Sequence, residues 1–319
     1  MINYMLNDIL KNKKCFKLIL GAGNSDVEEI EKLVYTYSLA GANLFDLNAS
    51  IEVVQAAKRA LKKANTEQNR YLCVSVGLYG DPHLNKAFID NSKCIRCKLC
   101  EKICPQSAIK NNEVISKKCI GCQRCFNVCK NEAIFLKSEY KEISEILPPV
   151  IEQGIDCIEF HAINEDEKKV EKIWNEINSI YKGNLSICLD RSTLGNKAFI
   201  NRVKKLISNK KNITIQADGA PMSGGCDDFK TTLQSVATAE LVQSANLDCF
   251  VLLSGGTNSK STELARLCDV DINGVAIGSY ARKIVKEYIE YEDFFENKKL
   301  INSALACAKE LVDKSLSFL

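Results

Sequence analysis

The sequence of 319 residues contains no run of eighteen apolar residues, so it lacks a segment that would cross a membrane as a helix. Its first residues, MINYMLNDILKNKKCF, also lack the apolar stretch of a secretory signal peptide. We therefore expect a cytoplasmic protein. The apolar content of 46% excludes the composition of a disordered chain, and the length allows one large α/β domain or two ordinary ones.

Cysteine, in contrast, is abundant, with 16 in the chain. In a long chain without an export signal, cysteines indicate metal ligands or reduced thiols rather than disulfides. Eight of them form two copies of the motif C-x2-C-x2-C-x3-C, twenty-five residues apart. The similarity continues beyond the cysteines, because Ala108-Ile109 in the first copy corresponds to Ala133-Ile134 in the second. The sequence therefore contains a duplicated unit.

The motif is typical of bacterial ferredoxin domains that bind two [4Fe-4S] clusters, and Pro105 follows the fourth cysteine of the first copy. Three thiolates of such a motif bind one cluster, while the fourth binds the cluster of the other copy. The spacing predicts two ligand sets, which are Cys94, Cys97, Cys100 and Cys129 for one cluster and Cys119, Cys122, Cys125 and Cys104 for the second. Two zinc sites or a disulfide knot are the alternatives.

The apolar residues among these motifs and the remaining cysteines also lead to expectations. We expect the cluster wrapping to consist of Ile95, Ile103, Ile109, Ile115, Ile120 and Ile134. The cysteines outside the motif stand in apolar runs and are expected to be small core residues. They are Cys15, Cys73, Cys157, Cys188, Cys226, Cys249, Cys268 and Cys307.

Outside residues 84–137, short β-branched runs alternate with stretches of helical period such as VEEIEKLVYTYSLA. The strands are predicted at 16–22, 43–48, 71–78, 155–162, 185–190, 212–219, 249–255 and 273–279. Eight strands, each followed by a helix, predict a (β/α)8 barrel of the TIM type, with an open doubly wound sheet as the alternative. The predicted units are residues 1–83 with three strands, an inserted two-cluster ferredoxin-like unit at 84–137, and residues 138–319 with five strands.

The insertion follows the third strand, so the clusters are expected over the barrel mouth, where the carboxyl ends of the strands bind ligands. Polar residues stand near the ends of several strands. The candidates for ligand contact are Asn24, Asp46, His161, Asp190 and Asp218, with Asn48, Glu159 and Arg191 beside them. Each of them also fits a loop cap or an internally hydrogen-bonded residue. No lysine is expected at the end of a strand inside the barrel, which argues against Schiff-base chemistry.

The segments SGGTNSKST and GSYARK follow the seventh and eighth predicted strands. Glycines let backbone amides approach an anion, and a helix N-terminus adds a favourable dipole, as in the phosphate sites of many barrels. The predicted phosphate site comprises Ser254, Gly255, Gly256, Gly278 and Ser279, with Lys260 or Arg282 as counter-charge. Tight turns without a ligand are the alternative interpretation.

The charge is uneven along the chain. Residues 91–130 hold nine basic and two acidic side chains, a net charge of +7, which leaves −4 for the rest of a chain whose total is +3. The basic residues alternate with cysteines and not with stacking aromatics, so we expect an acidic protein partner rather than a nucleic acid.

Several segments resemble one family over nearly the whole chain. QADGAPMSGG, DFKTTLQSVA, LLSGGTNSKSTELARLC and NGVAIGSYARKIV resemble the C-terminal domain of the cyanobacterial light-dependent period (LdpA) family, and SLAGANLFDLNA, GDPHLNKAFID and EKICP resemble its N-terminal half. The resemblance implies an iron-sulfur protein that senses cellular redox state and relays light-intensity information to the circadian clock. It implies no catalytic reaction. The alternative is an oxidoreductase whose clusters feed electrons to a flavin or another phosphorylated ligand in the barrel.

Overall fold

Eight parallel strands close into a barrel in the computed structural model, which describes residues 4–79, 81, 84–163, 166–191, 194–208, 210–219 and 226–319. The order around the barrel is β1, β12, β11, β10, β9, β8, β3 and β2, with every neighbouring pair parallel. The strands are β1 (Cys15–Ile19), β2 (Leu44–Asn48), β3 (Tyr71–Gly77), β8 (Cys157–His161), β9 (Asn184–Leu189), β10 (Thr214–Asp218), β11 (Phe250–Ser254) and β12 (Gly274–Ile277). All eight predicted strands are confirmed, and the open doubly wound sheet is wrong.

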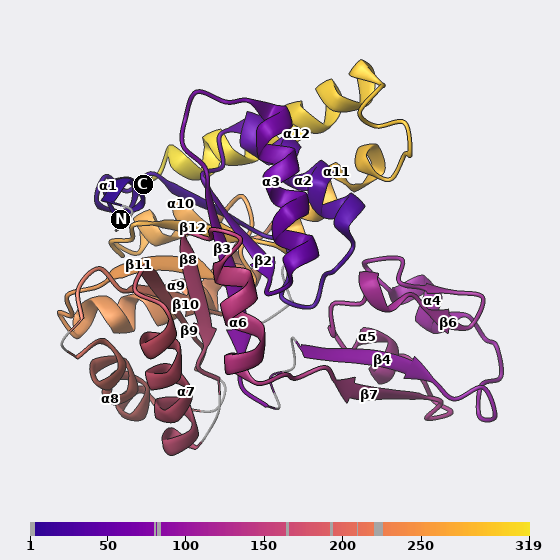
Figure 1. Ribbon diagram of the computed structural model, residues 1–319, viewed down its shortest axis with the longest axis horizontal. Coiled ribbons are helices and arrows are strands. Elements are labelled where there is room, and N and C mark those ends of the chain that lie inside the picture. Colours follow the sequence, from indigo (N-terminus) through magenta and orange to yellow (C-terminus); the bar gives the residue numbers. More distant parts are fainter. Residues whose placement is uncertain are drawn as a thin grey trace.

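Helices surround the barrel and shield the outward side chains of its strands (Figure 1). Their ends carry local signals. The Ser50 hydroxyl accepts a hydrogen bond from the Val53 amide at the start of α3, and Gly41 ends α2 with a φ of 108°. The helices are α2 (Val27–Ala40), α3 (Ile51–Ala64), α6 (Ile143–Ile151), α7 (Glu167–Ile180), α8 (Asn196–Ile207), α9 (Phe229–Ser244), α10 (Ser261–Leu267), α11 (Ser279–Ile289) and α12 (Lys298–Leu316). No helix in the described part of the chain has the length and apolarity that a membrane span requires.

The amino-terminal helix α1 (Tyr4–Lys11) closes one end of the barrel. Leu6 and Leu10 pack against a buried layer inside the barrel formed by Cys15, Leu44, Tyr71, Cys73, Cys157 and Leu252. In Figure 1, α1 lies on the opposite side of the barrel from the segment between β3 and β8. The open end of the barrel is therefore the end where the carboxyl termini of the strands meet.

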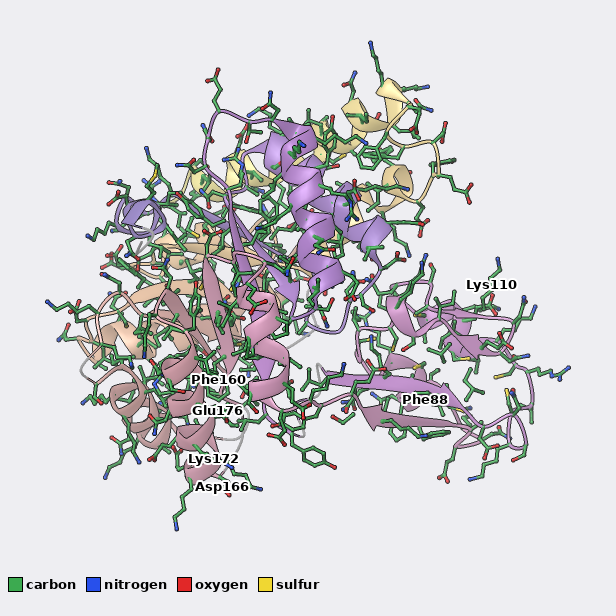
Figure 2. The ribbon with its side chains drawn as sticks, in the orientation of Figure 1. Phe88, Lys110, Phe160, Asp166, Lys172 and Glu176 are labelled. Carbon is green, nitrogen blue, oxygen red and sulfur yellow. The ribbon has the colours of Figure 1, made fainter. Side chains whose placement is uncertain are left out.

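The side chains of β8 point alternately outward to the helices and inward to the barrel interior. Phe160 points outward, and its ring stacks on Trp174 of α7 with 6.1 Å between centroids (Figure 2). Because side chains alternate along a strand, Glu159 and His161 point into the barrel. Both faces of the strand are buried.

The segment between β3 and β8 forms a separate small unit (Figure 1). Its elements are β4 (Asn85–Ile89), α4 (Leu99–Ile103), β5 (Ile109–Lys110), β6 (Glu113–Val114), the 3-10 turn Ser116–Lys118, α5 (Arg124–Val128) and β7 (Ile134–Ser138). The two halves repeat, because α4 and α5 begin twenty-five residues apart and each follows a residue in left-handed conformation, Lys98 and Gln123. A core of its own comprises Ala87, Ala108, Ile109, Cys119, Cys125 and Ile134.

The insert contacts the barrel mainly through polar groups. The Lys86 ammonium is buried and donates to the carbonyls of Gly23, Ser116 and Cys119, which joins the loop after β1 to the insert. The Ser25 amide donates to the Lys117 carbonyl at 3.0 Å. From α11, Lys286 donates to the Pro105 carbonyl at 2.9 Å.

We predict that replacing residues 84–137 by a short Gly/Ser linker leaves a soluble barrel that binds no iron. Asn85 pairs with Ser138 in the antiparallel β4–β7 ladder, so the two ends of the insert are adjacent and a short linker spans them. The insert has its own core, and loop length changes the folding entropy by only about 0.6 kcal/mol per doubling. Thermal unfolding followed by circular dichroism should remain cooperative. An insoluble or molten product would show that the insert and barrel share one folding unit.

Candidate functional site

The eight motif cysteines lie around two cavities in the insert. Ile134 and Ile89 line the first cavity together with Cys94, Cys97, Cys100 and Cys129. Ala108 and Ile109 line the second together with Cys104, Cys119, Cys122 and Cys125. Each set combines three cysteines of one repeat with the fourth of the other, which is the grouping that the spacing predicts.

The donor chemistry of both sets fits an iron-sulfur cluster. All sixteen cysteines lie in the part of the chain that the structure describes, and there each of them is a free thiol. The Ala108 amide donates to Cys104 Sγ at 3.3 Å, and the Ala133 amide donates to Cys129 Sγ at 3.4 Å. Amide hydrogen bonds to ligand sulfur stabilise the negative charge of a cluster. The equivalent bonds in the two repeats show that the duplication extends to the sulfur environment.

Two expectations about the surrounding apolar residues require correction. Ile109, Ile120 and Ile134 are buried, but Ile95 and Ile103 are 66% and 43% exposed. Ile95 still lines the cavity of Cys94, Cys97 and Cys100, whereas Ile103, at the end of α4, lines neither cysteine cavity. Of the cysteines outside the motif, Cys15, Cys73, Cys157 and Cys188 are buried in the barrel interior, Cys249 and Cys307 are half-buried, and Cys226 and Cys268 are exposed.

The second cysteine set lies next to the barrel mouth. Ile120, between Cys119 and Cys122, lines the cavity at the mouth, and a Cβ added to Gly21 would lie 3.7 Å from its methyl carbon. Cys122 and Arg282 line a neighbouring pocket between the insert and α11. The first cysteine set lines no part of either pocket. We therefore call the Cys104 set proximal and the Cys94 set distal.

The cavity at the barrel mouth has a volume of about 80 Å³ and opens to solvent. It brings together most of the residues predicted for the phosphate site and three of those predicted at the mouth. They are Ser254, Gly255, Gly256, Gly278, Ser279, Arg282, Asp46, His161 and Asp218. Glu159, Cys188 and Thr257 also line it.

Three predicted residues lie outside this cavity. Lys260 is the residue before α10 and lies 3.5 Å from Glu263, so its ammonium is not the counter-charge at the mouth. Asn24 is buried and donates to Glu29 while accepting from the Asp26 amide, which makes it a loop cap. Asp190 is buried beyond the end of β9 and does not line the cavity.

Gly255 and Gly278 are required by packing as well as by the cavity. Gly255 has a φ of 64°, and a Cβ there would collide with the Asp218 carboxylate. A Cβ on Gly278 would lie 3.1 Å from the Ile19 side chain. Replacing either glycine would disturb the fold as well as any anion, so a test of the anion site needs a different residue.

Arg282 supplies the positive charge at the mouth. It is 6% exposed, and its Nη1 donates to the Leu20 carbonyl at 3.1 Å. Its Nε is buried without a hydrogen-bond partner among the described residues. Burial lowers the pKa of Arg282, while Glu29 and the Cys122 sulfur favour the charged form. The mouth therefore presents a buried cation beside the helix N-terminus of α11, an arrangement that binds anions.

A buried lysine inside the barrel escaped the sequence analysis. Lys17, in the middle of β1, lies 2.5 Å from Glu159 Oε2 and 3.4 Å from Asp46 Oδ2. Burial opposes the charge, but the carboxylates of Asp46 and Glu159 raise the pKa of Lys17 well above its ordinary value. Burial likewise opposes the charge on Glu159, yet Lys17 and His161 lower its pKa to about 2. Lys17 stands in the middle of β1 and not at its carboxyl end.

His161 faces two carboxylates. Its Nδ1 lies 2.9 Å from Asp81 Oδ2, and its Nε2 lies 3.4 Å from Glu159 Oε1. Burial opposes protonation, but Asp81 and then Glu159 raise the pKa of His161 well above its ordinary value. The cavity floor therefore contains opposed buried charges below the cation at the mouth.

Comparisons with known proteins agree with this architecture. The model of the light dependent period A C-terminal domain matches residues 150–314, and that of the LdpA iron-sulfur cluster-binding domain matches residues 91–140. The curated protein "Light dependent period A" of Synechococcus elongatus is 29% identical over an alignment of 289 residues, and the match covers 86% of this chain and 82% of that protein. The solved YdjI aldolase of Escherichia coli K12 has a TM-score of 0.50 at 8% identity, covers 99% of this chain and 95% of its own, and is similar in fold alone.

The fold and the cysteine-rich domain define the class as an iron-sulfur protein built on a (β/α)8 barrel. The C-terminal family model alone spans more than half of the chain. The chain belongs to the light dependent period A family.

Proposed function

We propose that this protein is a redox sensor in which two [4Fe-4S] clusters, one distal and one proximal, report the reducing state of the cell to the barrel mouth. The observation that carries the proposal is the position of Ile120 and Cys122, which join the proximal cysteine set to the cavity and to Arg282. Reduction adds one electron to a cluster. The added negative charge strengthens its attraction for the nearby cation and weakens anion binding there.

The distal set supplies the entry point for electrons. It lies in the part of the insert that carries many of the basic side chains, among them Lys93, Arg96, Lys98 and Lys130. Exposed apolar side chains accompany them, including Ile95 and Leu99. A basic surface with a few apolar contacts fits transient docking of an acidic protein.

We infer the biological setting from the relative. The Synechococcus elongatus protein is named for a light-dependent period, and it is similar over 86% of this chain. Light changes the supply of reducing equivalents in a photosynthetic cell, so a redox sensor would carry light-intensity information towards a clock. Protein partners in clock input, reached in the cytoplasm, are part of the same proposal.

A second candidate is an oxidoreductase in which the clusters feed electrons to a flavin or another phosphorylated ligand. The observation that favours it is the mouth cavity, where Ser254, Gly256 and the start of α11 lie beside Arg282. Anaerobically purified protein that releases a fluorescent flavin on denaturation would favour this candidate over the sensor.

Redox titration tests the coupling on which the sensor depends. Inorganic phosphate in the cavity should disfavour an added electron, so it should lower the midpoint potential of the proximal cluster. Each tenfold difference in phosphate affinity between the oxidised and reduced forms corresponds to about 59 mV for one electron. In Arg282→Gln the shift should disappear, because the neutral amide does not attract phosphate.

Lys110→Gln is the matched control. Lys110 is an exposed cation on the insert, and Figure 2 shows it far from the barrel. This variant loses the same charge but should keep the phosphate-dependent shift. Equal shifts in Arg282→Gln and the parent, or no shift in the parent, would contradict a redox signal that passes through the mouth.

A further inference from the structure

Three buried side chains converge on the floor of the mouth cavity. Glu159 and His161 point inward from β8, and Cys188 faces them from β9, where it pairs in register with His161. One ligand atom of each lies within 4.8 Å of the other two. We propose that Glu159, His161 and Cys188 bind a divalent cation of the zinc type, separate from the iron-sulfur clusters.

His161 has the orientation of a metal ligand. Its Nδ1 is held by Asp81 Oδ2 at 2.9 Å, and the histidines of metal sites ordinarily direct their second nitrogen to a carboxylate in this way. The Asp81 carboxylate fits beside the strand because residue 77 is glycine, where a Cβ would collide with it. The backbone is thus shaped to place this carboxylate behind the imidazole.

Glu159 divides its two oxygens between two tasks. Lys17 lies 2.5 Å from Oε2, and the Ser186 hydroxyl donates to the same oxygen at 3.3 Å. Oε1 faces His161 Nε2 at 3.4 Å, which is longer than an ordinary N–H···O hydrogen bond. One oxygen is therefore fixed by the lysine, and the other is directed at the proposed site.

The spacing of the Glu159 and His161 ligand atoms suits zinc. Bond lengths of about 2.0–2.3 Å in a tetrahedron place ligand atoms roughly 3.3–3.8 Å apart. The pair Glu159 Oε1 and His161 Nε2, at 3.4 Å, already meets this spacing. The Cys188 sulfur lies within 4.8 Å of both.

The fourth coordination position would face the cavity, because all three residues line it. Three protein ligands with one open position are typical of zinc sites that bind substrate or water. An anion held at Arg282 and the start of α11 would lie in the same cavity. Binding of the cation releases the thiol proton of Cys188 and one imidazolium proton, so the net charge of the buried group is unchanged.

The test uses full-length protein with its clusters loaded under anaerobic conditions and then equilibrated with one equivalent of zinc. We expect about one zinc per chain by elemental analysis. Absorption at the zinc K-edge should show one sulfur at about 2.3 Å with nitrogen or oxygen at about 2.0 Å. Zinc bound by cluster cysteines would instead show a shell of four sulfurs, and that result would overturn the proposal.

Two variants and a control complete the experiment. Cys188→Ser should remove the sulfur from the zinc shell, and Asp81→Asn, which alters only the residue behind the imidazole, should weaken zinc binding 10- to 100-fold. Cys268→Ser removes an exposed thiol and should change neither the zinc shell nor the strength of zinc binding. Bound zinc with an unaltered shell in Cys188→Ser, or no bound zinc in the parent, would overturn the site. If Cys188→Ser does not fold, the number of sulfur atoms in the zinc shell of the parent tests the proposed site instead.

Iron content separates this proposal from the redox function. The barrel variants should retain the iron of the parent, because Glu159, His161 and Cys188 line neither cysteine cavity. If the barrel does not bind zinc, the iron content should still be that of the loaded protein. If the clusters do not form, the zinc shell should still show one sulfur.

Discussion

Cys129→Ala should bind about four irons per chain and the parent about eight, because one of the two proposed [4Fe-4S] clusters would lose a ligand. Cys129 lies beside Cys94, Cys97 and Cys100 in the folded chain, although it belongs to the other repeat. The distal cluster should therefore be lost and the proximal cluster kept. Iron and acid-labile sulfide, measured after anaerobic reconstitution, give the count.

Double variants reveal which cysteines share a cluster. Cys97→Ala with Cys129→Ala should lose no more iron than either change alone, because both remove ligands of the same cluster. Cys122→Ala with Cys129→Ala should lose nearly all of the iron. The reverse pattern would show that each repeat binds its own cluster, and Cys268→Ala, at an exposed position, serves as the control with full iron.

Lys17→Met should destabilise the fold by roughly 3–5 kcal/mol, the usual cost of removing one partner from a buried ion pair. The carboxylates of Glu159 and Asp46 would remain in the barrel interior without their cation. The midpoint temperature of thermal unfolding should fall by on the order of 10 °C. Adding Glu159→Gln to Lys17→Met should recover part of the loss, because one of the uncompensated charges is then removed.

Lys13→Met provides the matched control. Lys13 pairs with Asp271 at the surface, and both side chains are exposed. Exposed pairs contribute about 0–1 kcal/mol, so this variant should unfold close to the parent temperature. A Lys17→Met protein as stable as Lys13→Met would contradict a charged, desolvated pair in the barrel.

The strands and the cysteine motif could be predicted because their signals are local. Each strand of the barrel is a short apolar run between turn residues, and α2 begins and ends where its apolar period does, at Val27 and Ala40. Ligand spacing is local as well, since Cys94, Cys97 and Cys100 belong to one short loop and helix.

Lys17 illustrates what local patterns miss. Its neighbours Phe16 and Leu18 pack outward against the helices, so alternation turns Lys17 inward. Every barrel strand is buried on both faces, and polarity along the sequence does not show which face holds a charge. The partners Asp46 and Glu159 come from other strands and meet the lysine only when the barrel closes.

Tertiary contacts also decide which cation lies at the cavity. Lys260 and Arg282 stand at similar positions after two neighbouring strands, and the sequence left both open. The start of α10 turns Lys260 towards Glu263, while the first turn of α11 directs Arg282 back to the Leu20 carbonyl beneath the mouth.

The sequence by itself determined the number and order of strands, the duplication of the cysteine motif and the place of the insert in the chain. These features depend on hydrophobic period and on ligand spacing within a few residues. Only the tertiary structure decided that the Cys104 set is proximal, that Arg282 faces the cavity, and that Glu159, His161 and Cys188 converge on its floor. Such contacts join residues far apart in the chain, because barrel closure and docking of the insert set their distances.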